Sequence, residues 1–406
     1  MNHNKCVYLD NAATTATSES VIEIMNKVMR EDYGNPSSMH QKGVDAENYI
    51  KDARQIIAKT LKVEPKEIVF TSGGTEANNT ALIGAAFANK RAGMHLITTV
   101  MEHASVYNPM IYLEECGFEI TYINVDSMGH ICMEELKNAI REDTILVSVM
   151  MVNNEVGALN DIKAISDTIK EINPKTLLHV DAIQGFGKYK ILPKKMGIDL
   201  LSVSGHKFHG PKGSGFLYIK DRVKVKPFIH GGGQESGMRS GTENVPAIAG
   251  LGQAVKDIYE NHDVVMDNLY ELKGYFVYNV LKLNEELSID NISVNAVNVG
   301  DLTLEAVTEA VKETAPHVVS VSFKNIRSEV MLHALEERGV YVSSGSACSS
   351  NHPSISGTLK AIGVKKELLD STIRFSFSKN TTKEELDYAL AQVKELVPVY
   401  SRYVRR

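Results

Sequence analysis

The sequence lacks any apolar run long enough to cross a membrane, and its first fifteen residues lack the apolar segment that follows a basic start in secretory signals. We therefore expect a cytoplasmic protein with no membrane partner. An excess of positive charge is also missing, because 44 Lys and Arg face 50 Asp and Glu and the formal net charge is −6. Direct binding to nucleic acid is therefore not expected.

Cysteine is scarce, and none of the four forms a CxxC pair; they are Cys6, Cys116, Cys132 and Cys348. This spacing supports neither a disulfide framework nor a thiolate zinc site. His206 and His209 lie close together, but no acidic or thiolate cluster accompanies them in the sequence. We predict no metal site.

The composition is that of a globular protein, with 43% hydrophobic and 23% charged residues. A chain of 406 residues is too long for a single domain with one hydrophobic core. Short β-branched runs alternate with helical stretches from about residue 65 to 220, a pattern typical of right-handed β-α-β crossovers. The pattern predicts an α/β fold with a mostly parallel seven-stranded sheet. The expected strands are residues 67–71, 95–99, 119–123, 145–150, 177–181, 200–204 and 215–219; helices are expected at 75–90, 103–115 and 162–172.

A second region follows a long helical stretch at residues 245–285. Its strand candidates, 318–323, 340–343 and 373–376, predict a smaller α+β C-terminal domain, while the polar stretch 291–316 carries no clear pattern. We assign residues 16–264 to the large α/β domain and residues 1–15 and 265–406 to the small domain.

Open α/β sheets bind ligands beyond the carboxyl ends of their strands, so we examined the residues that follow each strand. The segment 71–76, TSGGTE, follows the first strand and opens a helix with small residues, which suits a phosphate group. An ordinary helix cap by Ser72 or Thr75 explains the segment equally well. It matches neither the dinucleotide fingerprint nor the P-loop, which disfavours a nucleotide.

Two further strand ends carry reactive groups. Asp181 and Gln184 follow the fifth strand, although a lone Asp there could simply cap a helix. Lys207 follows the sixth strand between glycines and polar residues, where a lowered pKa would make it a Schiff-base nucleophile. A surface lysine is the commoner case for such a position.

Residues 343–350, SSGSACSS, surround Cys348 with small side chains, which is typical of an exposed and reactive thiol rather than a packed one. Cys6, Cys116 and Cys132 lie in apolar or helical contexts, for which we expect a structural role.

A phosphate loop, an Asp at one strand end and a Lys at the next together resemble the fold-type I enzymes that use pyridoxal phosphate. The chain resembles in particular the NifS/IscS group of cysteine desulfurases, in the class V aminotransferase family. The matching segments run almost from end to end and are residues 8–15, 34–38, 152–157, the Lys207 segment, 231–234, 239–242 and 373–376.

The resemblance implies a role for each matching residue. Lys207 would bond to the cofactor as a Schiff base, Asp181 would pair with the ring nitrogen, and His103 would stack on the ring and take part in catalysis. The remaining cofactor contacts would be Gln184 and Asn154 at the phenolic oxygen, and Gly74, Thr75, Ser204 and His206 at the phosphate. Thr242 would reach the phosphate in the neighbouring subunit, so a homodimer with shared active sites is implied.

The resemblance also implies the reaction. Arg374, with Asn35, would hold the substrate carboxylate, and Cys348 would take sulfur from L-cysteine as a persulfide, leaving L-alanine. The sulfur would pass to an acceptor protein, an iron–sulfur scaffold or a tRNA-thiolation enzyme. Selenocysteine lyase, another class V aminotransferase, and an inactive sulfur-relay scaffold are the alternatives.

The chain departs from the family pattern at Ser236, where an arginine is usual. The lost charge puts the local packing or the docking of a partner in doubt.

Overall fold

The computed structural model describes residues 6–344 and 356–402. Its largest sheet has seven strands in the order β2-β8-β7-β6-β5-β3-β4. The strands are β2 (Ile68–Thr71), β3 (His95–Thr99), β4 (Glu119–Ile123), β5 (Thr144–Met150), β6 (Leu177–Asp181), β7 (Leu200–Ser204) and β8 (Gly215–Ile219). Within this sheet β8 alone runs antiparallel to its neighbours. The predicted α/β fold and its seven strands are confirmed, with two strand starts shifted by one residue.

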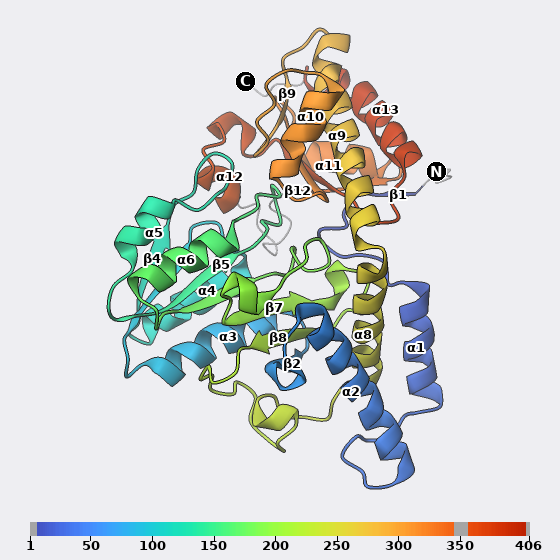
Figure 1. The fold of residues 1–406 in the computed structure, drawn as a ribbon. Helices are drawn as coiled ribbons and strands as arrows, with labels where there is room; N and C mark the ends of the chain where they lie inside the picture. Colours follow the sequence, from blue (N-terminus) through green and yellow to red (C-terminus); the bar gives the residue numbers. More distant parts are fainter. Residues whose placement is uncertain (1–5, 345–355, 403–406) are drawn as a thin grey trace.

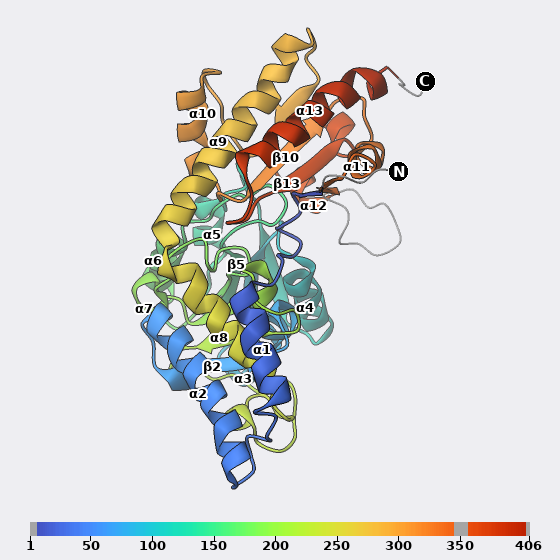
Figure 2. The ribbon, with the colours of Figure 1, turned by 90° about the vertical axis from the view of Figure 1, so that its right-hand side faces the viewer.

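Helices cover both faces of this sheet (Figures 1 and 2). They are α1 (Glu19–Arg30), α2 (Gln41–Leu61), α3 (Gly74–Asn89), α4 (Ala104–Glu115), α5 (Met133–Ala139), α6 (Ile162–Ile172), α7 (Pro193–Met196) and α8 (Val245–Glu260). None of the helices in the described part of the chain combines the length and the apolar character needed to cross a bilayer.

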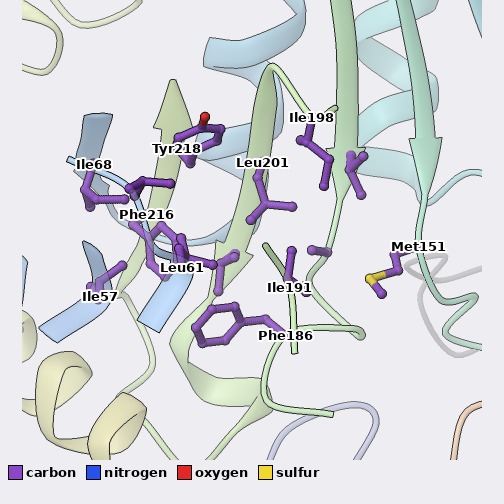
Figure 3. Packing of buried hydrophobic residues seen from close by; sticks show 14 of the residues in the cluster. Ile57, Leu61, Ile68, Met151, Phe186, Ile191, Ile198, Leu201, Phe216 and Tyr218 are labelled. Atoms are coloured by element: carbon purple, nitrogen blue, oxygen red, sulfur yellow. The ribbon is translucent and has the colours of Figure 1, made fainter. Parts of the chain in front are cut away.

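The pleat of the strands sorts their side chains between two hydrophobic layers. Leu200 of β7 packs with the α3 and α4 side chains, whereas Leu201 packs with those of α2 and α8. Figure 3 shows part of this second layer, in which Ile57 and Leu61 of α2 lie over Phe216 of β8. Both faces are therefore buried, which explains why the strands read as continuous apolar runs.

The second unit is built on a four-stranded antiparallel sheet in the order β12-β13-β10-β9. Its strands are β9 (Ile292–Val294), β10 (Val318–Phe323), β12 (Ser343–Ser344) and β13 (Thr372–Ser376), and a separate parallel pair joins β1 (Val7–Tyr8) to β11 (Val340–Tyr341). Its helices are α9 (His262–Glu286), α10 (Leu304–Ala310), α11 (Ser328–Glu336), α12 (Gly357–Ala361) and α13 (Lys383–Tyr400). Val7 and Leu9 are part of this hydrophobic core, so the N-terminal segment packs with the C-terminal region.

Three predictions for this half of the chain were wrong or incomplete. The helix expected at 245–285 is two helices, because Asn261 has φ −124° and ψ 35°, outside the helical range. The strand expected at 340–343 is divided: Tyr341 pairs with Tyr8, whereas Ser343 pairs with Arg374. The unassigned stretch 291–316 contains β9 and α10.

A buried lysine lies where α9 meets the segment before β10. Lys273 is fully buried, and its Nζ donates hydrogen bonds to Thr314 Oγ1 and to the Ala315 carbonyl oxygen, at 2.5 and 2.7 Å. Burial lowers the pKa of Lys273 to about 7. The folded protein therefore favours the neutral amine at alkaline pH.

We predict that Lys273→Met reduces the pH dependence of the free energy of unfolding between about pH 7 and 10. An ordinary lysine in the unfolded chain has a pKa of about 10.4, so the unfolded wild type binds more protons across this range and its stability rises with pH. Denaturant unfolding at pH 7, 8 and 9 measures the slope, with Lys312→Met, at an exposed lysine on the same domain, as the control. Equal slopes for wild type and Lys273→Met would contradict the prediction.

Candidate active site

A cavity of about 290 Å³ lies beyond the carboxyl ends of β5, β6 and β7. The side chains that line it come from both domains, because Arg374 of β13 closes one side. Ten of the residues singled out from the sequence line this cavity: Gly74, Thr75, His103, Asn154, Asp181, Gln184, Ser204, His206, Lys207 and Arg374.

The start of α3 forms one end of the cavity. Its N-cap is Gly73, with φ 148°, and no side chain caps the helix. Of the two alternatives for this segment, a cap by Ser72 or Thr75 is therefore not seen, and no side chain accepts a cap hydrogen bond there. A second hollow, lined by Thr75, Ser204 and Lys212 among others, adjoins the same loop. This arrangement suits an anion.

Asp181, the last residue of β6, is buried, and the donors to its carboxylate are neutral. Asn78 Nδ2 donates to Oδ2 at 2.8 Å, and the Ile183 N–H donates to Oδ1 at 3.0 Å. Burial raises the pKa of Asp181, and these hydrogen bonds and the charges of His103 and Lys207 oppose that rise. A cationic ligand group at this carboxylate would stabilise its ionised form.

His103 is the N-cap of α4 and lines the same cavity as Lys207. Its Nδ1 accepts a hydrogen bond from the Ser105 N–H at 3.1 Å and lies 2.8 Å from Ser105 Oγ. Because Nδ1 is an acceptor, the neutral ring carries its hydrogen on Nε2. Burial lowers the pKa of His103, and the charge of Lys207 lowers it further, whereas Asp181 raises it.

Lys207 follows β7, and its Nζ contacts the N-terminal segment. Nζ donates to the carbonyl oxygens of Ala12 and Ala13 at 2.6 and 2.8 Å. Gln184 Nε2 also donates to the Ala12 carbonyl oxygen, at 2.9 Å. Thr15 holds this segment in place through its Oγ1, which donates to the His206 carbonyl oxygen at 2.9 Å.

Arg374 of β13 lines the cavity and is almost fully buried. Nη1 donates to the Asn154 carbonyl oxygen and Nη2 to Asp10 Oδ1, both at 2.8 Å. Its Nε is buried with no hydrogen-bond partner in the described part of the chain. The guanidinium is therefore held in one orientation from its outer nitrogens, as a fixed carboxylate clamp requires.

The comparisons with known proteins agree with this geometry. A profile of the aminotransferase class-V family matches residues 7–389. The chain belongs to this family. Among its relatives, a cysteine desulfurase IscS of Dictyoglomus turgidum is 41% identical over 391 residues, covering 96% of this chain and 94% of the relative. Another cysteine desulfurase IscS, of Clostridium botulinum strain Hall, is 39% identical over 409 residues, covering 99% and 98%.

Two solved structures extend the comparison. A NifS-like protein aligns with a TM-score of 0.88 and 37% identity, covering 97% of this chain and all of that one. A structure described as SspA in complex with cysteine aligns with a TM-score of 0.76 and 34% identity, covering 92% and 99%. The fold-type I arrangement predicted from the sequence is confirmed.

The cofactor of class V aminotransferases is pyridoxal phosphate, and the residues of the cavity fit it. The uncapped start of α3 suits the phosphate, the buried carboxyl of Asp181 suits a protonated ring nitrogen, and Lys207 supplies an amine in the same cavity. Gly74 permits the close approach, because a Cβ there would meet Ile183 Cδ1 at 2.1 Å.

Two predicted residues, Asn35 and Thr242, do not line this cavity. Asn35 is exposed in the loop between α1 and α2, and this loop lies at the end of the large domain farthest from the small domain (Figures 1 and 2). Thr242 is exposed and lines a different hollow, together with Glu235 and Arg239. Cys348 lies outside the described residues. Asn35 and Thr242 could contact an active site only in a second subunit, so their roles stay predictions.

The expected structural role of the other cysteines was wrong. Cys6, Cys116 and Cys132 are free and exposed. Cys116 and Cys132 lie at the ends of helices, where neighbouring apolar residues are buried but the cap residue itself faces solvent.

Ser236 and His209 have local explanations. Ser236 is exposed, with φ 55° and ψ 32°, so its small side chain causes no loss of buried packing. His209 Nδ1 bonds the Ala16 carbonyl oxygen at 2.8 Å and thus fixes the N-terminal segment. The described residues contain no group of three or more His, Cys, Asp or Glu that could hold a metal ion.

The sequence analysis missed Asn78 and Ser105. The two hydrogens of Asn78 Nδ2 reach Asp181 Oδ2 and Ser105 Oγ, so one buried amide connects Asp181 to the His103 side of the cavity. Their positions held a usable signal: Asn78 lies one helical turn after Gly74 on the same helix, and Ser105 comes two residues after His103.

We predict that Gly215→Ala weakens the binding of pyridoxal phosphate. A Cβ at Gly215 would lie 2.5 Å from the Val203 carbonyl oxygen and 2.9 Å from Gly73 Cα, so the phosphate loop must move. Gly300→Ala is the control, because a Cβ there meets nothing within 4 Å. Titration of the apoprotein with the cofactor should give a dissociation constant raised about tenfold or more for Gly215→Ala alone, a shift of about 1.4 kcal/mol. An unchanged constant would refute the prediction.

Proposed function

We propose that this protein is a cysteine desulfurase that uses pyridoxal phosphate and Cys348. The reaction converts L-cysteine and the Cys348 thiol to L-alanine and a Cys348 persulfide, which balances without an external oxidant or reductant. The observation that carries the proposal is the single cavity that joins Lys207, Asp181 and Arg374. Full-length similarity to cysteine desulfurases, together with a structural relative described in complex with cysteine, supports the choice of substrate.

The cavity residues singled out from the sequence each have a task in this reaction. Lys207 would be the attachment point of the cofactor, and Asp181 would keep the ring nitrogen protonated. When bound, pyridoxal phosphate supplies an electron-poor ring that accepts the electron pair left on the substrate Cα. His103 would cover the ring face, and Gln184 and Asn154 would bind the phenolic oxygen. Gly74, Thr75, Ser204 and His206 would hold the phosphate.

The proton and sulfur transfers then fall to three side chains. Arg374 binds the substrate carboxylate and orients the Cα–H bond toward Lys207. Lys207 Nζ takes the Cα proton as general base. The Cys348 thiolate attacks the substrate sulfur, so that an S–S bond forms, the Cβ–S bond breaks, and Cβ gains a proton to give alanine.

The proposal includes a homodimer, in which Thr242 and Asn35 of each chain reach the active site of the other. Both side chains are exposed in this chain and lie away from the cavity, which is where an intersubunit contact would have them. The persulfide then passes to an acceptor protein in iron–sulfur assembly or tRNA thiolation.

The decisive experiment quantifies sulfide and alanine after incubation of the cofactor-loaded protein with L-cysteine and a reductant. We expect equal amounts of both products, and a loss of roughly a thousandfold or more in Lys207→Ala and Cys348→Ala, because each change removes a reacting group. Cys116→Ala, at an exposed cysteine, is the matched control and should retain full activity.

Other outcomes would select a different function. Cleavage of selenocysteine alone would indicate a selenocysteine lyase, and transfer of the amino group without sulfide would indicate an aminotransferase. Bound cofactor with no turnover of any of these would indicate an inactive scaffold.

A second prediction concerns Arg374. We expect Arg374→Lys to raise KM for L-cysteine about 10- to 100-fold with a smaller change in kcat, because a lysine cannot make the paired hydrogen bonds to a carboxylate that a guanidinium makes. Steady-state kinetics measure both constants. Arg338→Lys, at a surface pair with Glu395, is the control. An unchanged KM would exclude Arg374 as the carboxylate clamp.

A further inference from the structure

A histidine of the small domain contacts Gln184, one of the residues that line the cofactor cavity. His317 precedes β10, and its carbonyl oxygen accepts a hydrogen bond from the Phe377 N–H at 2.9 Å, which fixes its backbone in the small-domain sheet. Its ring is buried, and Nε2 lies 2.9 Å from Oε1 of Gln184 in the large domain. His317 does not line the cavity, so it can act on the cofactor only through Gln184.

The hydrogen bonds fix which way the Gln184 amide faces. Nε2 lies 2.9 Å from the carbonyl oxygen of Ala12, which can only accept, so the nitrogen must be the atom on that side. Oε1 then faces His317, whose Nε2 must carry a hydrogen to donate. The other ring nitrogen, Nδ1, is buried without a partner among the described residues.

The surroundings keep this ring neutral. Burial lowers the pKa of His317 well below its ordinary value, and the charges of the neighbouring cations lower it further. These cations are Lys188, Lys273, Arg374 and Lys207. The environment therefore favours the neutral ring, which donates to Gln184 through the hydrogen on Nε2.

One carbonyl oxygen connects this pair to the reactive lysine. The Ala12 carbonyl oxygen accepts from Gln184 Nε2 and from Lys207 Nζ, at 2.9 and 2.6 Å. Gln184 Nε2 has a second hydrogen, and Gln184 lines the cavity. With Oε1 occupied by His317, the group that Gln184 can offer to a ligand is this N–H.

We propose that His317 is a positioning residue that holds the Gln184 amide so that its free N–H donates to the phenolic oxygen of bound pyridoxal phosphate. The proposal rests on cofactor binding as stated under Proposed function. Without His317, Oε1 would be buried with no donor. The amide could then turn, and a turned amide would place Oε1 against the Ala12 carbonyl oxygen, an acceptor against an acceptor. The donated hydrogen bond to the cofactor would be weakened.

The test is the pH titration of the visible absorbance of the bound cofactor. A hydrogen bond donated to the phenolic oxygen stabilises its anionic form, so loss of that bond makes the oxygen more basic. The proton shared between this oxygen and the nitrogen that joins Lys207 to the cofactor is then lost only at higher pH. We expect His317→Leu to raise the midpoint by about 0.5 to 1 pH unit, as the loss of one hydrogen bond implies. His317→Gln, which keeps an N–H donor with similar reach, should retain the wild-type midpoint.

The Gln184→Leu background separates positioning from a general loss of structure. There, adding His317→Leu should cause no further shift, because the amide through which His317 acts is gone. A wild-type midpoint in His317→Leu, an equal shift in His317→Gln, or a full additional shift in the double variant would each overturn the proposal. Should the leucine variant fail to fold, His317→Phe removes the same nitrogens while filling the volume of the ring, and the same outcomes decide.

A wild-type protein with no visible absorbance band after loading has a different meaning. It would overturn the proposed function itself, and the inference with it. A normal wild-type band with an unshifted variant overturns the role of His317 alone.

Discussion

The buried carboxyl group of Asp181 sets the main constraint on this structure. A carboxylate with only neutral hydrogen-bond donors, at the end of a central parallel strand, is costly unless a positive group of the ligand compensates for it. The protein keeps it in place with Asn78, which is itself fixed by Ser105. The folded protein without cofactor is therefore destabilised by this carboxyl group. Binding of the cofactor, which requires the folded state, stabilises the folded protein.

The need to pair buried polar groups also explains why the N-terminal segment crosses the site. Lys207 and Gln184 are polar groups at a partly buried cavity, and the carbonyl oxygens of Ala12 and Ala13 satisfy their donors. The segment is held at both ends: the Ser376 N–H donates to the Leu9 carbonyl oxygen at 2.7 Å, and Thr15 bonds the His206 carbonyl oxygen. Residues from the beginning, middle and end of the chain thus meet at one site.

The sequence predicted the large sheet well because its signal is local. The strands are buried on both faces, so each reads as an apolar run, and the reactive residues follow directly at the strand ends. Asp181 and Lys207 became candidates in this way, although a helix cap and a surface lysine stayed open as explanations until the family resemblance was considered. The resemblance to a family added His103, Asn154 and Arg374, whose local sequences carry no signal of their own.

What could not be predicted depends on contacts between distant segments. The interruption at Asn261 separates two helices that pack in different cores, and the local sequence there is helical on both sides. The strand at 340–344 divides because Tyr8 and Arg374 offer partners in different sheets. The partnership of His317 with Gln184, 133 residues apart, exists only in the folded chain.

The small domain contributes a side chain to the cavity that the strand ends of the large sheet do not provide. Strand ends of the large sheet place Asp181 and Ser204 at the cavity, whereas Arg374 reaches the same cavity from β13 of the other sheet. Glu155 extends this link: it is partly buried, it follows Asn154, and Ser356 Oγ donates to its Oε2 at 2.5 Å. Burial raises the pKa of Glu155, and hydrogen bonds from Ser356 and Thr358 and the charge of Arg374 oppose that rise. The start of α12, which follows the Cys348 segment, is therefore attached to Glu155, the residue next to the Asn154 that accepts a hydrogen bond from Arg374. The position of the Arg374 guanidinium and the attachment of α12 thus depend on two consecutive residues of one loop.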